Sequence, residues 1–398
     1  MGEYSGNTNR IKLKIIITII AGIAILQFAG AGTPEANNSE PQPQSRIESS
    51  TQYKDGKFNG MGNTLNMSFT DMVSTTWDFL FTSNNRTPDT ELPVKQVDLS
   101  RFNNKGSDQL NVTWLGHSSL MINIDGYKIL TDPVFEKRVS IFGPTRFNGD
   151  VPLDIRLIPK IDAVIISHDH YDHLNKYTVQ RLIDKADKFI VPLAVADYLE
   201  DWGVPRDKII ELDWWQEHRI DQNLMVAATP AQHFSGRGIT DRNKTLWASW
   251  VIKTPFHKIF FSGDSGYFGG FSQIGDKYGP FDMTFIECGA YGEGWPKVHM
   301  FPEQTVQAHL DLKGKVLHPI HWGTFNLAMH PWYEPMARLT TAANSKNVKT
   351  ATPIVGETTV FAGSIPSARW WEQPMQLSGA EIETASMHRP TTESVKNE

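Results

Sequence analysis

The sequence predicts an α/β protein in which strands and helices form layers. From Asn111 onward, short apolar runs typical of buried strands alternate with stretches of helical periodicity. Several of these runs break into a small or polar turn that carries a histidine or an aspartate, and active sites of layered folds lie at such turns. The chain has 398 residues, of which 40% are hydrophobic. This length suits one large domain of about 300 residues with appendages, or two ordinary domains.

The first expected elements form a hairpin. Strands at 111–124 and 127–132 are expected to pair, because Asp125-Gly126 between them is a strong turn signal. The runs that follow predict a strand at 163–167, a helix at 176–186, a strand at 189–193 and a helix that ends at Gly203.

Strands dominate the next part of the chain. Apolar runs predict them at 208–212, 224–229, 246–253, 257–264 and 315–322. A helix is expected at 302–312, where Pro302 occupies a favourable first position. The segments 126–133 and 256–264 each run a strand into a loop with an aspartate. This similarity between the two segments would suit a duplicated core of two sheets, although the repeated stretch is short.

The N-terminus resembles an export signal. Arg10, Lys12 and Lys14 precede an apolar stretch at 15–32 that ends in a small-residue A-x-A pattern. The stretch is also long enough to span a bilayer uncleaved. Residues 1–32 are therefore expected to be a signal peptide or an N-terminal membrane anchor. Both interpretations place the rest of the protein outside the cytoplasm, either anchored to the membrane or in the periplasm.

Composition divides the remaining chain into three parts. Residues 33–60 are rich in proline, asparagine, serine and glutamine at their start and are expected to be a flexible linker. Residues 61–372 form the main domain, with an N-terminal extension that includes a short helix at 69–81. Residues 373–398 are a polar C-terminal tail.

Charge and cysteine content exclude several classes of function. The net charge of −6 and the lack of a basic stripe argue against nucleic-acid binding. A single cysteine, Cys288, excludes an intramolecular disulfide and a cysteine-rich metal site. Because Cys288 follows an apolar run, it is expected to be a buried thiol at a strand end and not a nucleophile.

The motif SHDHYDHL at 167–174 indicates a metal site. In an extended segment His168 and His170 point to the same side, whereas Asp172 and His173 lie beyond a turn. Imidazole and carboxylate ligands favour zinc over magnesium or calcium. The two pairs are expected to serve two ions, each with further ligands from elsewhere. The candidates at other strand ends are His233, Asp264, and either His318 or His321, which face opposite ways on one strand.

The order of these residues resembles the metallo-β-lactamase superfamily. Within it, the chain is similar to the branch of N-acyl-phosphatidylethanolamine-hydrolysing phospholipases D over about residues 110–340. The segments that carry this resemblance are WLGHSS, ISHDHYDHL, PAQHFSGR, FSGDSGY, ECGAY, HMFPEQTVQAH and IHWGTFNLA. The resemblance implies an αββα sandwich, with two central sheets flanked by helices.

The resemblance also implies a binuclear zinc site and an activity. It assigns His168, His170 and His233 to the first zinc ion. It assigns Asp172, His173 and His321 to the second, with Asp264 bridging both. The implied reaction is hydrolysis of N-acyl-phosphatidylethanolamine to N-acylethanolamine and phosphatidic acid, through a hydroxide held by the two ions.

Other site residues follow from the same segments. Asp172, Asp264 and His299 are the candidate catalytic residues, with His299 positioning substrate or protonating the leaving group, or else capping the helix at Pro302. His117 is expected to contact the metal ligands and not the metal ions themselves. Asp132 either orients a ligand histidine or starts a turn. Asp169 is expected to point away from the metals.

Two alternatives to a phospholipase remain open. One is a dizinc hydrolase of another ester or lactone, such as a sugar-phosphate lactone. The other is a non-catalytic exported zinc-binding protein. A membrane surface is an expected partner, since Trp214-Trp215, Trp322, Trp332 and Trp370-Trp371 suggest an interfacial patch or an apolar mouth, unless they are core residues. The sequence leaves open whether the chain forms a homo-oligomer.

Overall fold

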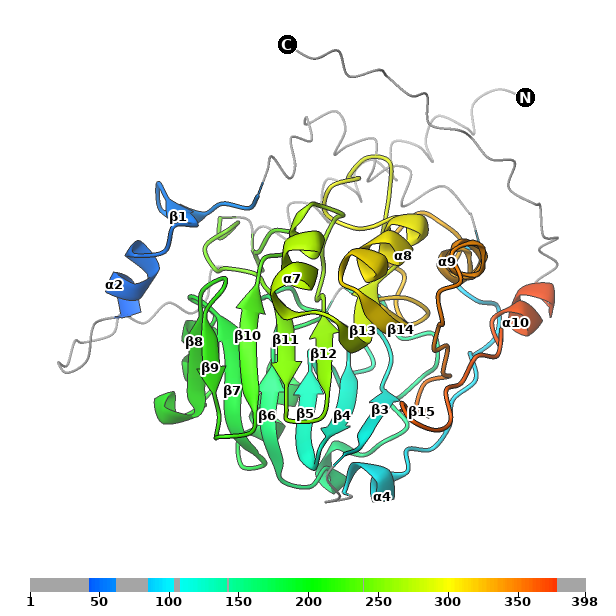
Figure 1. The fold of residues 1–398 in the computed structure, drawn as a ribbon, viewed down its shortest axis with the longest axis horizontal. Coiled ribbons are helices and arrows are strands. Elements are labelled where there is room, and N and C mark those ends of the chain that lie inside the picture. The colour runs from blue at the N-terminus through cyan, green and yellow to red at the C-terminus, as the bar shows by residue number, and fades with distance from the viewer. Residues whose placement is uncertain (1–42, 62–84, 104–107, 142, 239, 378–398) are drawn as a thin grey trace, which may run out of the picture.

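Two β-sheets stack face to face in the computed structural model, with helices on their outer sides (Figure 1). The structure describes residues 43–61, 85–103, 108–141, 143–238 and 240–377. This arrangement confirms the predicted αββα sandwich. It arises because the strands are buried on both faces and each sheet therefore needs a layer on either side.

The first sheet has seven strands in the order β15-β3-β4-β5-β6-β7-β8. Pairing is antiparallel from β15 to β5 and parallel from β5 to β8. The strands are β3 (Leu110–Trp114), β4 (Leu120–Ile124), β5 (Tyr127–Thr131), β6 (Ile161–Ile165), β7 (Ala186–Pro192), β8 (Ile209–Leu212) and β15 (Thr358–Val360).

The second sheet has six strands in the order β14-β13-β12-β11-β10-β9. Strands β12, β13 and β14 are parallel, and β10 runs in the same direction because β11 is antiparallel to both β10 and β12. The strands are β9 (Glu217–Arg219), β10 (Met225–Thr229), β11 (Ser249–Lys253), β12 (Lys258–Phe261), β13 (Phe281–Glu287) and β14 (Gly314–Ile320).

Helices cover the outer face of each sheet. Helices α5 (Lys176–Leu182) and α6 (Ala196–Asp201) share a buried cluster with the first sheet, and α4 (Leu99–Phe102) contacts β4. Helices α7 (Gly270–Tyr278), α8 (Pro302–Asp311) and α9 (Glu334–Ser345) lie over the second sheet. Short 3₁₀ turns occur at Ile155–Leu157 and Arg206–Lys208.

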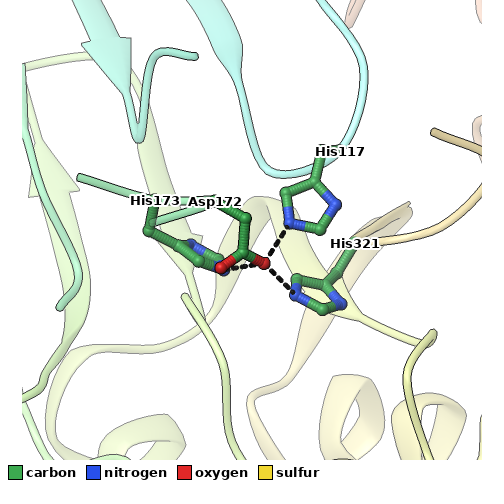
Figure 2. A group of neighbouring side chains, drawn as sticks. All are labelled: His117, Asp172, His173 and His321. Carbon is green, nitrogen blue, oxygen red and sulfur yellow. Dashed lines mark hydrogen bonds and ion pairs between the residues drawn. The ribbon is translucent and has the colours of Figure 1, made fainter. Parts of the chain in front are cut away.

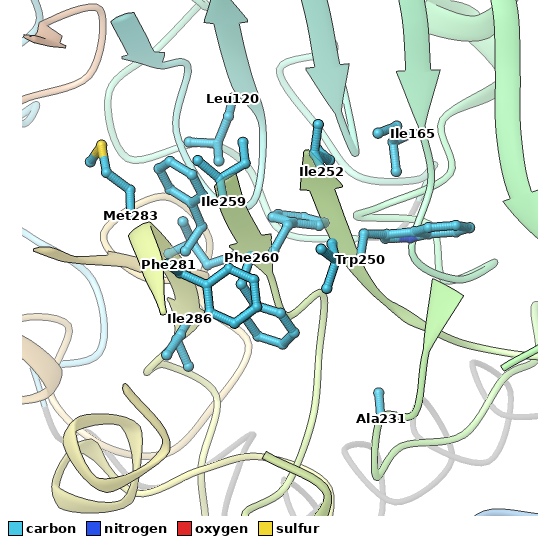
Figure 3. Close-up of a cluster of buried hydrophobic side chains, with 14 of the residues drawn as sticks. Leu120, Ile165, Ala231, Trp250, Ile252, Ile259, Phe260, Phe281, Met283 and Ile286 are labelled. Atoms are coloured by element: carbon cyan, nitrogen blue, oxygen red, sulfur yellow. The ribbon is translucent and has the colours of Figure 1, made fainter. Parts of the chain in front are cut away.

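The main core lies between the sheets. Leu120 and Ile165 of the first sheet face Ile252 and Ile259 of the second (Figure 3). Trp250 is fully buried, and its indole Nε1 donates a hydrogen bond to the carbonyl of Ile166, 3.1 Å away. This bond ties the second sheet to the strand end that precedes the SHDHYDHL motif.

Several expectations are corrected in detail. Residues 111–124 are not one strand but two, β3 and β4, separated by a turn in which His117 has a φ of 55°. The predicted turn at Asp125-Gly126 does join β4 to β5. The helix expected at 176–186 ends at Leu182, because the chain enters β7 at Ala186. The sequence did not predict β9, β15, α4, α7 or α9, and it predicted β13 only as a strand that ends before Cys288.

Part of the predicted linker is folded onto the domain. Residues 43–58 form α2 (Pro43–Glu48) and a small hairpin of β1 (Tyr53–Lys54) and β2 (Lys57–Phe58). Phe58 is fully buried in the core. In the tail, α10 (Glu372–Leu377) is the last described element, and residues 378–398 lie outside the described part.

The tryptophans expected at a surface patch belong mostly to the core. Trp214, Trp322, Trp332 and Trp371 are buried, and Trp215 and Trp370 are half-buried and pack against the main core. The apolar stretch at 15–32 and the helix expected at 69–81 lie outside the described residues. Among the helices of the described part, none has the length and apolar character needed to cross a bilayer.

The burial of Phe260 gives a test of the packing. Phe260 is fully buried, and its ring lies 6.2 Å from that of Phe271 in α7, whereas Phe256 on the preceding turn is 60% exposed. We expect Phe260→Ala to lower the free energy of unfolding by about 3–5 kcal/mol and Phe256→Ala by less than about 0.5 kcal/mol. Urea denaturation of both variants checks this, and equal losses would contradict the described packing.

Candidate metal centre

Seven polar residues meet at one end of the sandwich, on turns that follow strands. They cluster because β6 and the parallel strands of the second sheet all end at this edge. His168, His170, Asp172 and His173 follow β6, His233 follows β10, Asp264 follows β12, and His321 follows β14. The turn within the motif is closed by hydrogen bonds from the backbone N–H groups of His173 and Leu174 to the carbonyl of His170.

The first group consists of His168, His170 and His233. His168 Nε2 lies 2.9 Å from His170 Nδ1, and His233 Nε2 lies 3.3 Å from the same atom. The other ring nitrogens of two members are fixed: His168 Nδ1 is 2.9 Å from Ser167 Oγ, and His233 Nδ1 donates to the carbonyl of Val298 at 3.0 Å. Three imidazole nitrogens therefore converge on one point.

The second group consists of Asp172, His173 and His321, with His117 beside them (Figure 2). Asp172 Oδ2 lies 3.4 Å from the Nε2 atoms of both His173 and His321. His117 Nε2 donates a hydrogen bond to the same oxygen at 2.9 Å. His117 thus contacts the centre through Asp172, and it is close enough to belong to the cluster itself.

Asp264 lies between the two groups. Its Oδ2 atom is 3.0 Å from His321 Nε2 and 3.2 Å from His173 Nε2. The same oxygen is 3.8 Å from the Nε2 atoms of His168 and His233. One carboxylate therefore reaches histidines of both groups.

The residues fit metal ions. In a tetrahedral zinc site, nitrogens roughly 2 Å from the ion lie about 3.3 Å apart, which is close to the spacing within the first group. His173 Nε2, His321 Nε2 and Asp264 Oδ1 are buried and make no hydrogen bond of good geometry. Buried polar atoms are rarely left so, and a shared cation would satisfy all of them. The cluster can therefore hold a metal.

The electrostatics of the cluster favour positive charge. Burial lowers the pKa of His321, but Asp264 and Asp172 outweigh it and raise that pKa to about 10. Burial raises the pKa of Asp264, yet His173 and His321 bring it well below its usual value. In the first group, burial and neighbouring histidines hold the pKa of His168 well below its usual value, so this ring is neutral, as metal ligation requires.

Hydrogen bonds on the side away from the metal centre hold the ring of His173 in place. Asp132 Oδ2 lies 2.7 Å from His173 Nδ1, and the two Asp132 oxygens also accept bonds from the backbone N–H and the hydroxyl of Ser167. This contact leaves His173 Nε2 to face the centre. Asp132, His117 and His321 all have a positive φ, a strained backbone that is typical of functional sites.

Glu287, at the end of β13, is a site residue that sequence reasoning missed. Its side chain is fully buried, one oxygen accepts a bond from the N–H of Met300 at 2.7 Å, and the other has no partner. His299 Nδ1 lies 3.5 Å from Glu287 Oε1. A charged residue closing the run MTFI was the available signal, because glutamate is rarely found at the end of a buried strand.

Other candidates lie outside the cluster. His318 is buried against Trp114 and Phe285, facing away from His321. Asp169 binds the loop that follows His233, through Gly236 and Thr245. Cys288 is fully buried, and this burial raises the pKa of its thiol well above the usual value.

Comparisons with known proteins agree with the fold and place the chain in a family of hydrolases. A model of the beta-lactamase superfamily domain matches residues 127–322. An uncharacterized protein of Mycobacterium tuberculosis is 40% identical over 364 residues, which cover 89% of this chain and 96% of the relative. N-acyl-phosphatidylethanolamine-hydrolyzing phospholipase D 1 of Caenorhabditis elegans is 32% identical over 272 residues, covering 65% of this chain and 76% of the relative.

One solved structure supports the fold independently of close sequence similarity. The isothiocyanate hydrolase from Delia radicum gut bacteria is 18% identical, with a TM-score of 0.50. The match covers 63% of this chain and 98% of that chain.

The contact between Asp132 and His173 gives a test of the cluster. We expect Asp132→Asn to lower the affinity for Zn²⁺ by about 10–100-fold. Both oxygens of Asp132 accept hydrogen bonds, and the amide NH₂ group of asparagine would instead face a donor, either Nδ1–H of His173 or Ser167. Titration of the metal-free protein against a chromophoric chelator measures this. Asp276→Asn, at a residue 70% exposed, is the matched control. Unchanged affinity in Asp132→Asn would contradict the role of Asp132.

Proposed function

Because the chain belongs to the metallo-β-lactamase superfamily of metal-dependent hydrolases, in the branch of the N-acyl-phosphatidylethanolamine-hydrolysing phospholipases D, we propose that it is a zinc-dependent phosphodiesterase of phospholipase D type. Its proposed substrates are N-acyl-phosphatidylethanolamine and similar phospholipids. The C. elegans relative, whose name states this activity, supports the substrate class.

We assign two zinc ions to the cluster. His168, His170 and His233 would hold the first, Asp172, His173 and His321 the second, and Asp264 would contact both. The observation that carries the proposal is the position of Asp264, whose Oδ2 atom lies within 3.8 Å of two nitrogens from each group. Nitrogen and oxygen ligands in this number suit zinc.

The bound ions would supply an activated water and positive charge to stabilise the phosphoryl oxygens. The carboxylates of Asp172 and Asp264 would place negative charge at the two proposed metal positions and would keep these positions close together. The oxygen of water forms a new bond to phosphorus, and the bond from phosphorus to the ethanolamine oxygen breaks. The products are phosphatidic acid and N-acylethanolamine.

His299 is suited to protonate the leaving oxygen. Its ring lies 5.1 Å from that of His233 and 5.2 Å from that of His321, so it borders both proposed metal positions. Glu287, at 3.5 Å from Nδ1, can orient the ring and leave Nε2 for proton transfer. His299 would give its proton to the ethanolamine oxygen as the phosphorus bond breaks.

We further propose that the protein is exported and acts at a membrane surface. The basic and apolar N-terminal sequence supports export or anchoring. An anchor would raise the local concentration of the enzyme at its lipid substrate.

A ligand variant tests the metal assignment. We expect His170→Ala to lower bound zinc and to reduce turnover of bis-(p-nitrophenyl) phosphate by at least about 10²-fold, because the first ion loses one of its ligands. Metal analysis, kinetics and circular dichroism check this. Cys288→Ala is the control and should keep most activity. Full activity in His170→Ala would reject the assignment, and an inactive but folded Cys288→Ala would indicate a thiol mechanism.

The lipid products test the substrate class. Zinc-loaded protein is incubated with vesicles of mixed phospholipids that include N-acyl-phosphatidylethanolamine, and the products are identified by mass spectrometry. We expect phosphatidic acid and N-acylethanolamine. Hydrolysis of lactones without any lipid product would favour a lactonase. Two bound zinc ions without turnover of lipid, lactone or generic diester would favour a non-catalytic zinc-binding protein.

A further inference from the structure

The motif residues that do not face the metal centre contact the loop after His233. Asp169 Oδ1 accepts a hydrogen bond from the N–H of Gly236 at 2.8 Å, and Asp169 Oδ2 accepts one from Thr245 Oγ1 at 3.0 Å. Arg237 Nη1 donates to the carbonyls of Asp169, at 2.5 Å, and Leu174, at 2.8 Å. Gly236, Arg237 and Thr245 of the loop at 234–245 therefore hold both ends of the loop that carries His170.

Aromatic rings surround the guanidinium of Arg237. It lies 3.9 Å from the ring centre of Tyr171, 5.5 Å from that of Tyr198 and 5.4 Å from that of Trp202. A planar guanidinium can stack on a ring and donate in its own plane at the same time, which an ammonium group cannot do. Arg237 thus fills a site that fits its shape and charge.

Among the described residues, a hydrogen bond fixes the outer ring nitrogen of three histidines in the cluster, but not that of His170 or His321. His168, His173 and His233 each have their outer ring nitrogen fixed by Ser167, Asp132 and Val298, respectively. In the part of the chain that the structure describes, no protein group bonds to Nε2 of His170. Its ring instead meets that of Phe234 edge-on at 4.7 Å. Its orientation therefore depends on the backbone on either side and on the loop at 234–245.

We propose that Arg237 is a positioning residue that fixes His170 by clamping the two loops together, and so sets the affinity of the first metal position. This inference rests on the proposed function, because it takes His168, His170 and His233 as ligands of one ion. Its effect should be confined to that ion, since Asp132, His117 and β14 hold the ligands of the second.

Arg237→Gln removes both hydrogen bonds and the stacking charge. Arg237→Lys keeps the charge without the planar donors. Lys244→Gln is the matched control, because Lys244 belongs to the same loop, is exposed, and donates its hydrogen bond to the carbonyl of Gly56, 2.9 Å away. Each change is made in a His321→Ala background, which isolates the first position, and in a His233→Ala background, which isolates the second. Zn²⁺ affinity is measured by chelator competition, and the Tm of each metal-free variant is recorded.

We expect Arg237→Gln to weaken Zn²⁺ binding about 10–100-fold at the first position and by less than about 3-fold at the second. Arg237→Lys should be intermediate and Lys244→Gln unchanged. Unchanged first-position affinity, or equal losses at both positions with a lower metal-free Tm, would overturn the inference. If Arg237→Gln does not fold, Arg237→Lys carries the same comparison. Failure of the unmodified protein to bind two zinc ions would instead reject the proposed function.

Discussion

The structure depends on holding carboxylates and imidazoles together at one buried point. Asp172 and Asp264 face His173 and His321 at 3.0–3.4 Å, and all of them except Asp172, which is 15% exposed, are almost fully buried. Buried charges need a partner of opposite sign, and here protonated histidines or metal ions can provide it. The raised pKa of His321, which Asp264 and Asp172 impose against the effect of burial, shows how strongly this point favours positive charge. The surrounding fold has to keep these groups from separating.

The sandwich keeps these carboxylates and imidazoles together by bringing the ends of several strands to one edge. Parallel pairing of β5 with β6, and of β12 with β13 and β14, brings turns from distant parts of the chain to the same edge. Trp250 ties the sheets together next to the motif, and Asp132 links the end of β5 to His173. Within SHDHYDHL, alternate residues serve different purposes. His168 and His170 face the centre, whereas Asp169 holds the neighbouring loop.

Much of this could be predicted from the sequence because the signals were local or shared with a family. Apolar runs located most of the strands, Asp125-Gly126 located the β4–β5 turn, and the resemblance supplied the sandwich. Residues 111–124 were misjudged because the apolar pattern continues through a turn whose left-handed backbone at His117 is set by distant contacts, such as the bond from its N–H to Thr324. Glu287 and Arg237 could not be assigned roles, since those roles arise only from residues far away in the chain.

The most direct measurement of the central claim is anomalous X-ray diffraction at the zinc absorption edge, from crystals grown with zinc. Two anomalous peaks are expected, one among His168, His170 and His233 and one among Asp172, His173 and His321, with the Asp264 carboxylate between them. A single peak elsewhere, or no ordered peak at this end of the sandwich, would contradict the account.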